Sequence, residues 1–332
     1  MFLFFLFYAI IFMKKYGFGE YMLNKEMLNK IKEYDNICIF GHTFPDGDCY
    51  GAQSGLKQFL IENFTCNVYI LGSGFSKAIP YFGKMDEVSD EVVKSSLAIL
   101  VDCSDLERVE DKRITLAKEI VKFDHHLGSD LSTFASINIS NTKACSASQM
   151  IGEFIIDNGY ILSKEVAERI FLGMVTDTGR FQYLTSSKGT FALLEKIMEA
   201  KIDFQKIYDF LYESDERSTR AKGYISYSFK TYKKIAYIVL DKKTLKELNI
   251  DANYASTMVN CLSLMKEYPI WAMFSENEDG LVRVELRAKK YNVQQVATLF
   301  GGGGHLNASG CRLKSIDEYQ NVLDELLKIV EE

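Results

Sequence analysis

Short apolar runs alternate with helical patterns along the first half of the chain. The runs are typical of buried strands, and stretches with helical spacing such as GAQSGLKQFLIEN separate them; they are NICIF (36–40), CNVYIL (66–71), LAILV (97–101) and IVKF (120–123). Strands that alternate with helices build βαβ units, whose strands lie parallel in one sheet. Helical patterns then dominate from about 146 to 212. We therefore predict an α/β fold with a parallel sheet in this part of the chain.

A second and smaller domain is expected after a polar junction. The stretch YESDERSTRAKG (212–223) precedes three further strand patterns, KKIAYIVL, YPIWAMFSE and GLVRVELRA, and the chain ends in the helical pattern IDEYQNVLDELLKIVEE. This mixture of strands and helices is typical of a mixed α/β domain. We predict a first domain over 22–205, a linker over 206–228 and a mixed domain over 229–332. The active site is expected in the cleft between the two domains.

The composition is that of an ordinary folded protein. With 332 residues, of which 47% are hydrophobic and 25% charged, the chain is long enough for two domains with a core each. A net charge of −6 argues against a protein that coats long nucleic acid through charge alone, so no long duplex is expected as a partner. Seven cysteines without a C-x-x-C pair indicate reduced thiols and a cytoplasmic location.

The chain begins with an apolar run, MFLFFLFYAIIFM, that is followed by Lys14 and Lys15. This run is too short for a comfortable membrane span, and it lacks the basic start and the cleavage site of a signal peptide. A weak anchor, a processed segment or a start codon assigned too early would each explain it. We favour the last, because the segment from Met22 already reads as a helix that leads into a strand. Residues 1–21 are then an extension that the fold does not need, and no membrane partner is expected.

All 4 histidines lie in short segments rich in glycine and polar residues. These segments are GHTFPDGDCYG with His42, VKFDHHLG with His125 and His126, and FGGGGHLNASG with His305. The first two directly follow predicted strands, as does VDCSD with Asp102. Because the carboxyl ends of parallel strands meet at one edge of a sheet, these side chains should lie close together. Asp177, in GMVTDTGRFQY, can join them.

Carboxylates and imidazoles at such an edge need positive charge among them, because crowded carboxylates repel one another and lose their solvation. Several aspartates with two or three histidines and no thiolate suit Mn²⁺ or Mg²⁺, with Zn²⁺ or Co²⁺ as alternatives. Asp46 and Asp48 flank a glycine in HTFPDGD, so their carboxylates can point to two different ions. The sequence therefore predicts a centre for more than one divalent ion.

Five motifs, in this order, resemble those of the DHH phosphoesterase superfamily. HTFPDGD, VDCSD, DHH and TDTGRF are similar to its four N-terminal motifs, and GGGGHLNASG is similar to the glycine-rich signature of its DHHA1 domain. The resemblance extends from about Met22 to the C-terminus. Within the family, the chain most resembles the compact type that includes nanoRNases and 3′-phosphoadenosine-5′-phosphate (pAp) phosphatases.

The resemblance implies two metal sites that share a ligand. The first ion would have the ligands His42, Asp46 and Asp102, and the second the ligands Asp48, Asp102, His125 and Asp177. Asp102 would bridge the two ions, which we expect to be Mn²⁺, with Mg²⁺ or Co²⁺ as alternatives. In the same pattern His126 would face the substrate phosphate, and Asp124 would orient an imidazole.

The implied activity is metal-dependent hydrolysis of a phosphoric ester, by a water molecule that attacks in line with the leaving oxygen. The implied substrates are short oligoribonucleotides, pAp or both, which would be cut to mononucleotides. One alternative is a phosphodiesterase for linear dinucleotides (pApA or pGpG) or cyclic dinucleotides. A second is a nucleotide sensor that does not cut; such a protein would have lost a metal ligand, and no ligand is missing here.

The C-terminal domain is expected to select the substrate. Gly302, Gly303 and Gly304 would let backbone amides approach a phosphate or a base, and Arg287 offers a bidentate guanidinium group to a terminal phosphate. In the family the matching arginine and histidine hold one end of a short nucleotide chain, which implies the same role for His305. Short RNA or small nucleotides are therefore the expected partners, and the sequence leaves a homodimer open.

Overall fold

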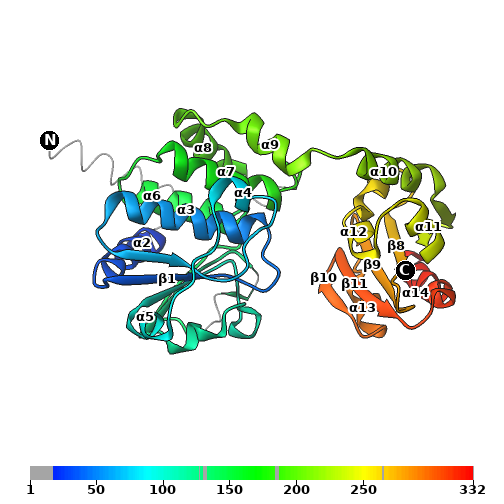
Figure 1. Ribbon diagram of the computed structural model, residues 1–332, viewed down its shortest axis with the longest axis horizontal. Helices are drawn as coiled ribbons and strands as arrows, with labels where there is room; N and C mark the ends of the chain where they lie inside the picture. The colour runs from blue at the N-terminus through cyan, green and yellow to red at the C-terminus, as the bar shows by residue number, and fades with distance from the viewer. Residues whose placement is uncertain (1–17, 127, 130–132, 184–186, 264, 332) are drawn as a thin grey trace. The chain divides into compact units, whose positions relative to one another are not determined.

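Two compact units divide the chain, one up to Glu213 and one from Ser214. The structure is a computed structural model that describes residues 18–126, 128–129, 133–183, 187–263 and 265–331, and each unit is described by itself (Figure 1). The segment 206–228, predicted as a linker, is mostly helical: it contains the end of α9 (Phe204–Tyr212) and all of α10 (Glu216–Ser228). The cleft between the domains stays a prediction.

The first described helix, α2 (Phe18–Ile31), begins ahead of Met22, where the sequence predicted its start. The earlier part of the predicted N-terminal extension, residues 1–17, lies outside the described residues. Within the described part of the chain, no helix is long and apolar enough to span a membrane.

The first unit contains a five-stranded parallel sheet in the order β2-β1-β3-β4-β5. Its strands are β1 (Asn36–Phe40), β2 (Asn67–Ile70), β3 (Leu97–Val101), β4 (Glu119–Asp124) and β5 (Ile137–Ser140). Its further helices are α3 (Gly47–Asn63), α4 (Ile79–Phe82), α5 (Asp90–Ser95), α6 (Ala147–Asp157), α7 (Lys164–Asp177) and α8 (Ser187–Glu199), with the short 3₁₀ turns η1 (Leu106–Arg108) and η2 (Lys112–Leu116). The predicted parallel sheet is confirmed, and β5 is an edge strand that the sequence patterns missed.

Helices cover both faces of this sheet, which explains the apolar runs of its central strands β1 and β3. α2, α3, α6 and α7 lie over one face and α5 over the other (Figure 1). Ile37 and Ile39 of β1 pack into the core on the side of the four helices, whereas Cys38 and Phe40 pack on the side of α5. A strand buried on both faces reads as a continuous apolar run, because neither side of its pleat is solvated.

Helices α3 and α7 approach one another closely through glycines. A Cβ atom at Gly51 of α3 would lie 2.7 Å from the Arg169 carbonyl oxygen of α7, and one at Gly173 of α7 would lie 2.7 Å from Asp48 Oδ1 of α3. Only glycine fits at such distances. The close contact fixes α7 against α3 beside Asp48, and Asp177 is the last residue of α7.

The second unit contains a six-stranded mixed sheet in the order β10-β11-β9-β8-β7-β6, in which only the β7–β8 pair is parallel. Its strands are β6 (Lys230–Tyr232), β7 (Ile235–Leu240), β8 (Ile270–Glu276), β9 (Val282–Ala288), β10 (Gly303–His305) and β11 (Ala308–Leu313). Its further helices are α11 (Lys242–Glu247), α12 (Ala252–Ser256), α13 (Gln294–Leu299) and α14 (Tyr319–Glu331), with the 3₁₀ turns η4 (Val259–Leu262) and η5 (Ile316–Glu318). The predicted mixed α/β domain is confirmed.

Candidate metal centre

The predicted ligands meet where the strand order of the parallel sheet reverses. The chain leaves β1 for β2 on one side and then crosses to β3 on the other side. In open α/β sheets, this reversal leaves a crevice at the carboxyl ends of the strands. His42 follows β1, Asp102 follows β3 and His125 follows β4, so three distant segments bring their side chains to the same crevice.

Asp102 lies at the middle of this group. Its Oδ2 atom is 3.4 Å from His42 Nε2, and its Oδ1 atom is 3.4 Å from His125 Nε2 and 3.7 Å from His126 Nδ1. Its backbone adopts a left-handed φ of 54°, and its N–H donates to the Phe123 carbonyl at 3.0 Å, which ties the end of β3 to β4. The carboxylate therefore lies between two imidazoles, and the bridging role of Asp102 stays a prediction.

A second set of donors surrounds His125. Its Nε2 atom lies 3.9 Å from Asp48 Oδ2 and 3.7 Å from Asp177 Oδ2. Asp48 is buried, and its two carboxylate oxygens accept hydrogen bonds from the Ala147 and Ser148 amides at 2.6 and 2.9 Å, at the start of α6. Because amides at a helix N-terminus favour negative charge, α6 holds this carboxylate in place.

His42 and Asp46 complete the edge of the site. The Thr43 carbonyl lies 2.9 Å from His42 Nδ1 and can only accept a hydrogen bond, so Nδ1 donates and Nε2 faces Asp102. Asp46 caps α3: its Oδ1 atom accepts from the Asp48 and Cys49 amides, and it lies 4.0 Å from His42 Nε2. The Asp46 side chain is 57% exposed, so it lies at the rim of the site.

The charges in the site shift one another's pKa values. Burial lowers the pKa of His42 and of His125, but their close contacts with the Asp102 carboxylate and the charges of the other nearby carboxylates outweigh burial and raise these pKa values to about 9 and about 10. Burial and the neighbouring carboxylate of Asp102 raise the pKa of Asp48 well above its usual range, and burial raises that of Asp177 to about 6. Protonated imidazoles therefore balance part of the carboxylate charge in the metal-free site, and divalent ions could take over this role.

The donor set fits divalent metal ions. Ligand atoms of Asp48, His125 and Asp177 all lie within 4.8 Å of one another, as do those of His42, Cys49 and Asp102. Asp102 Oδ1 is buried and has no hydrogen-bond partner among the described residues, as expected of an oxygen that a cation would contact. Cys49 is buried, as predicted, and burial raises the pKa of its thiol well above the usual range.

A buried lysine, which sequence reasoning missed, supports the DHH segment. The Lys122 side chain on β4 is fully buried, and its ammonium group lies 3.7 Å from Asp124 Oδ2 and donates to the Ser129 carbonyl and hydroxyl oxygens at 2.9 and 2.8 Å. Asp124 Oδ1 in turn lies 2.7 Å from His126 Nδ1. The signal was present in IVKFD, because residues two apart in a strand project from the same face.

The predicted substrate arginine already has partners within the second unit. Arg287 Nη2 lies 3.1 Å from Glu285 Oε2, and its Nη1 donates to the Leu286 and Ser309 carbonyl oxygens at 2.9 and 3.3 Å. Glu285 also pairs with Arg283, at 2.9 Å. These three side chains lie on the same face of β9, so Glu285 sits between two arginines.

The glycine segment forms the β10 hairpin arm. A Cβ atom at Gly302 would lie 2.1 Å from the Gly310 carbonyl oxygen, and one at Gly304 would lie 2.6 Å from the Ala308 carbonyl oxygen, whereas Gly303 has open space beside it. Gly302 and Gly304 therefore pack closely against β11 of the same sheet, and the approach of their backbone amides to a ligand stays a prediction. His305 ends β10, and its side chain lies outside the described part of the structure.

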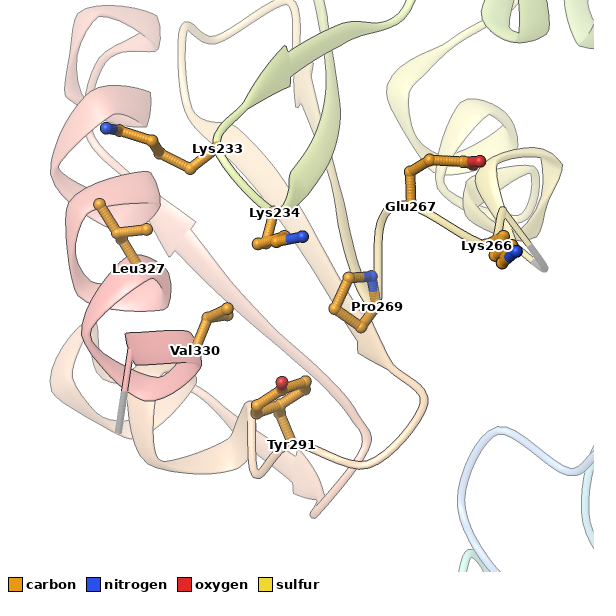
Figure 2. A pocket seen from close by; sticks show the side chains of 8 residues that line it. All are labelled: Lys233, Lys234, Lys266, Glu267, Pro269, Tyr291, Leu327 and Val330. Atoms are coloured by element: carbon orange, nitrogen blue, oxygen red, sulfur yellow. The ribbon is translucent and has the colours of Figure 1, made fainter.

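A separate pocket of about 600 Å³ opens on the second unit. Its lining residues, shown in Figure 2, come from the β6–β7 turn, the approach to β8, the segment after β9 and α14: Lys233, Lys234, Lys266, Glu267, Pro269, Tyr291, Leu327 and Val330. The Lys233 and Lys266 side chains lie at opposite ends of it (Figure 2), so their ammonium groups do not converge on one anion. Arg287 does not line this pocket.

Comparisons with known proteins identify a family for both units. The model of the DHH family N-terminal domain matches residues 36–174, and the DHHA1 domain model matches residues 232–332. The chain is 31% identical to a probable bifunctional oligoribonuclease and PAP phosphatase NrnA of Streptococcus mutans, over 92% of this chain and 98% of that protein. It is 32% identical to the bifunctional oligoribonuclease and PAP phosphatase NrnA of Mycoplasma genitalium, over 91% of this chain and 96% of that protein.

A solved structure has the same architecture. The crystal structure of an exopolyphosphatase-related protein from Bacteroides fragilis matches with a TM-score of 0.84 and 25% identity, over 94% of this chain and 98% of that one. The order of the motifs, the two matched domains and the relatives that match along nearly their whole length lead to one conclusion: the chain belongs to the DHH/DHHA1 phosphoesterase family.

Proposed function

We propose that this phosphoesterase uses two divalent metal ions to hydrolyse short oligoribonucleotides and pAp to mononucleotides. The main support is the position of Asp102, with one carboxylate oxygen 3.4 Å from His42 Nε2 and the other 3.4 Å from His125 Nε2. Related proteins named as oligoribonucleases and PAP phosphatases, which match along nearly their whole length, support the choice of substrates.

The proposed ligands are those that the sequence predicted. The first ion would be held by His42, Asp46 and Asp102, and the second by Asp48, Asp102, His125 and Asp177. When bound, such ions supply Lewis acidity, which neutralises charge on a phosphoryl group and lowers the pKa of water. We propose Mn²⁺, with Mg²⁺ or Co²⁺ as alternatives, because the donors are carboxylates and imidazoles.

His126 is the proposed contact to the scissile phosphate. A carboxylate accepts hydrogen bonds, so the Nδ1–H group of His126 donates to Asp124 Oδ1, and Nε2 is the nitrogen that would face a phosphoryl oxygen. Lys122 is buried with its ammonium group 3.7 Å from Asp124 Oδ2, so it balances the charge of the carboxylate that orients the ring.

The second unit would hold the far end of the substrate through Arg287, the hairpin glycines and His305. For Arg287 this requires an exchange of partners, because its guanidinium group is paired with Glu285. A substrate phosphate can compete for the guanidinium group, since the Arg287 side chain keeps 23% of its surface exposed.

A substrate panel tests the proposal. The purified chain with Mn²⁺ is incubated with RNAs of two to five nucleotides, pAp, pApA, pGpG and cyclic dinucleotides, and initial rates are ranked. We expect the short RNAs and pAp to be cut fastest. Faster cleavage of linear or cyclic dinucleotides would favour the dinucleotide phosphodiesterase, and nucleotide binding without hydrolysis in Mn²⁺, Mg²⁺ or Co²⁺ would indicate a sensor.

A further inference from the structure

Left-handed backbone conformations concentrate in the loops of the candidate metal centre. Among the described residues other than glycine, those with positive φ are Phe44, Asp102, Arg180, Phe181, Lys201, Lys233 and Asn249. The last three lie just beyond α8, in the β6–β7 turn and just beyond α11, where chain reversals use this conformation routinely. The other four lie in segments that contribute the site's carboxylates.

Phe44 is the most unusual of these residues. Its φ is 57°, a conformation that is an outlier for a bulky side chain, and 94% of its surface is exposed. Phe40, four residues earlier, is fully buried. Ile161 and Tyr227 are also more than 90% exposed, but neither has a left-handed backbone or lies in a segment of the site.

The loop around Phe44 is held in place on both sides. The Thr43 amide donates to the Arg108 carbonyl at 2.8 Å, and His42 forms a bridge to Val109. On the other side, Asp46 caps α3 through the Asp48 amide at 2.9 Å. The exposed ring therefore extends from an anchored loop, only two residues from each of the proposed ligands His42 and Asp46.

We propose that Phe44 is a stacking platform for a nucleobase of the substrate. The inference rests on the proposed function, because it takes the occupant to be a nucleotide whose phosphate lies at the metal centre. Strained residues at functional sites persist where they place a side chain for its task. An aromatic ring stacks on any base face, so such a contact would favour nucleotides over other phosphate esters without selecting a sequence.

The kinetic test uses Phe44→Asn, because asparagine tolerates the left-handed backbone and leaves the loop in place. Initial rates with Mn²⁺ are measured for pApA and for the same compound with an abasic ribose in place of each adenosine. We expect kcat/KM for pApA to fall about 5- to 150-fold, the range for loss of one base–aromatic stack, and the abasic compound to change less than about twofold. Phe44→Trp should retain the wild-type preference. Equal losses on both compounds would overturn the inference and leave the proposed function standing.

A binding test does not depend on hydrolysis. The chain contains one tryptophan, Trp271, which is only 6% exposed. Phe44→Trp therefore adds an exposed tryptophan, whose fluorescence can be followed against that of one buried tryptophan. The variant is titrated with AMP and with ribose 5-phosphate in Mn²⁺. We expect AMP, but not ribose 5-phosphate, to quench the tryptophan fluorescence of the variant in a saturable way. Neither compound should quench the fluorescence of the wild-type chain. If the wild type cuts no nucleotide, the proposed function fails and this titration still decides the stacking role: no AMP-specific quenching refutes it.

Discussion

The two units differ in how far their charged side chains are paired with opposite charges. In the first, Asp46, Asp48, Asp102 and Asp177 gather around two imidazoles, and a buried oxygen of Asp102 has no hydrogen-bond partner among the described residues. In the second, Arg287 is already satisfied by Glu285 and two carbonyl oxygens. On the proposed function, the carboxylates of the first unit would bind added cations, whereas Arg287 in the second unit would have to release Glu285 before it binds a phosphate. Removing a charge should therefore have different consequences in the two units.

Asp102→Asn should have the largest effect. The carboxylate approaches both His42 and His125, so a neutral amide in its place would weaken both proposed metal sites together. We expect kcat/KM to fall by at least about 1,000-fold, the scale at which a principal electrostatic group is lost, with a lower metal content and an intact far-UV spectrum. Asp105→Asn is the control, because Asp105 only caps η1. A variant that binds two metals and keeps several per cent of activity would contradict the bridging role.

Lys122→Met tests the one buried cation described beside the site. Removing one partner of a buried ion pair leaves an uncompensated charge and costs about 3 to 5 kcal/mol. Since the Lys122 side chain is fully buried beside Asp124, we expect the urea midpoint of the first unit to fall accordingly. Lys94→Met, on the exposed surface of α5, should change stability by less than about 0.5 kcal/mol. Similar stabilities for the two variants would show that Asp124 does not depend on Lys122.

Arg287→Ala should weaken the binding of a nucleotide substrate without impairing the hydrolysis step itself. Loss of a charge-assisted contact costs about 2 to 4 kcal/mol, which corresponds to about 30- to 1,000-fold in kcat/KM for pAp. Bis-p-nitrophenyl phosphate has no nucleotide end to hold, so its hydrolysis should fall much less. Metal content, measured in parallel, should stay unchanged. An equal loss on both substrates would place Arg287 in the catalytic apparatus or the fold.

Metal affinity should rise with pH. Because the pKa values of His42 and His125 are about 9 and about 10 without metal, both imidazoles must release protons before they bind an ion. Each proton released strengthens apparent affinity by up to about tenfold per pH unit. Titration calorimetry between pH 6.5 and 8.5, in buffers of different ionisation enthalpy, measures the metal affinity and the number of protons that metal binding releases. Affinity that does not depend on pH would exclude these histidines as ligands.

The same shifts predict how pH changes the stability of the metal-free protein. His42 and His125 bind protons more tightly in the folded protein than in the unfolded chain, where the histidine pKa is about 6.5. Proton binding by these two residues therefore adds to the free energy of unfolding, and the added stability is fully present below about pH 6.5. This added stability is lost as pH rises through about 9 and 10. The unfolding temperature of the metal-free chain should therefore fall as pH rises from about 6.5 to about 10. Addition of Mn²⁺ at pH 8.5 should raise the unfolding temperature again.

Glu285→Gln should have the smallest effect, and in the opposite direction. A neutral amide at this position would compete less strongly for Arg287, so a phosphate would recruit the guanidinium group more easily. We expect KM for pAp to fall about two- to fivefold, the scale of a partly exposed ion pair, with kcat unchanged. Glu325→Gln, which removes a similar pair with Lys328 on α14, should leave KM unchanged. A higher KM would mean that Glu285 positions Arg287 instead of competing for it.

Local patterns predicted the parts of the fold that depend on continuous burial. The strands β1, β3 and β4 lie where apolar runs were found, because a strand covered on both faces needs no polar residue. β5 and the hairpin arm β10 were missed, since short edge strands and glycine-rich strands have no such pattern. The polar stretch within 206–228 gives no apolar pattern that would predict the helix α10, and the role of this segment as a linker stays a prediction.

The sequence by itself determined which residues stand at the carboxyl ends of the strands, and hence that His42, Asp102 and His125 should meet, because parallel strands place these ends at one edge. Only the tertiary structure decided the partners. It buried Lys122 against Asp124, paired Arg287 with Glu285 and left Phe44 exposed on a strained backbone. These two pairings and this exposure depend on how individual atoms pack and how far solvent reaches them. The chemical type of a residue and the pattern of its neighbours in the sequence do not specify either property.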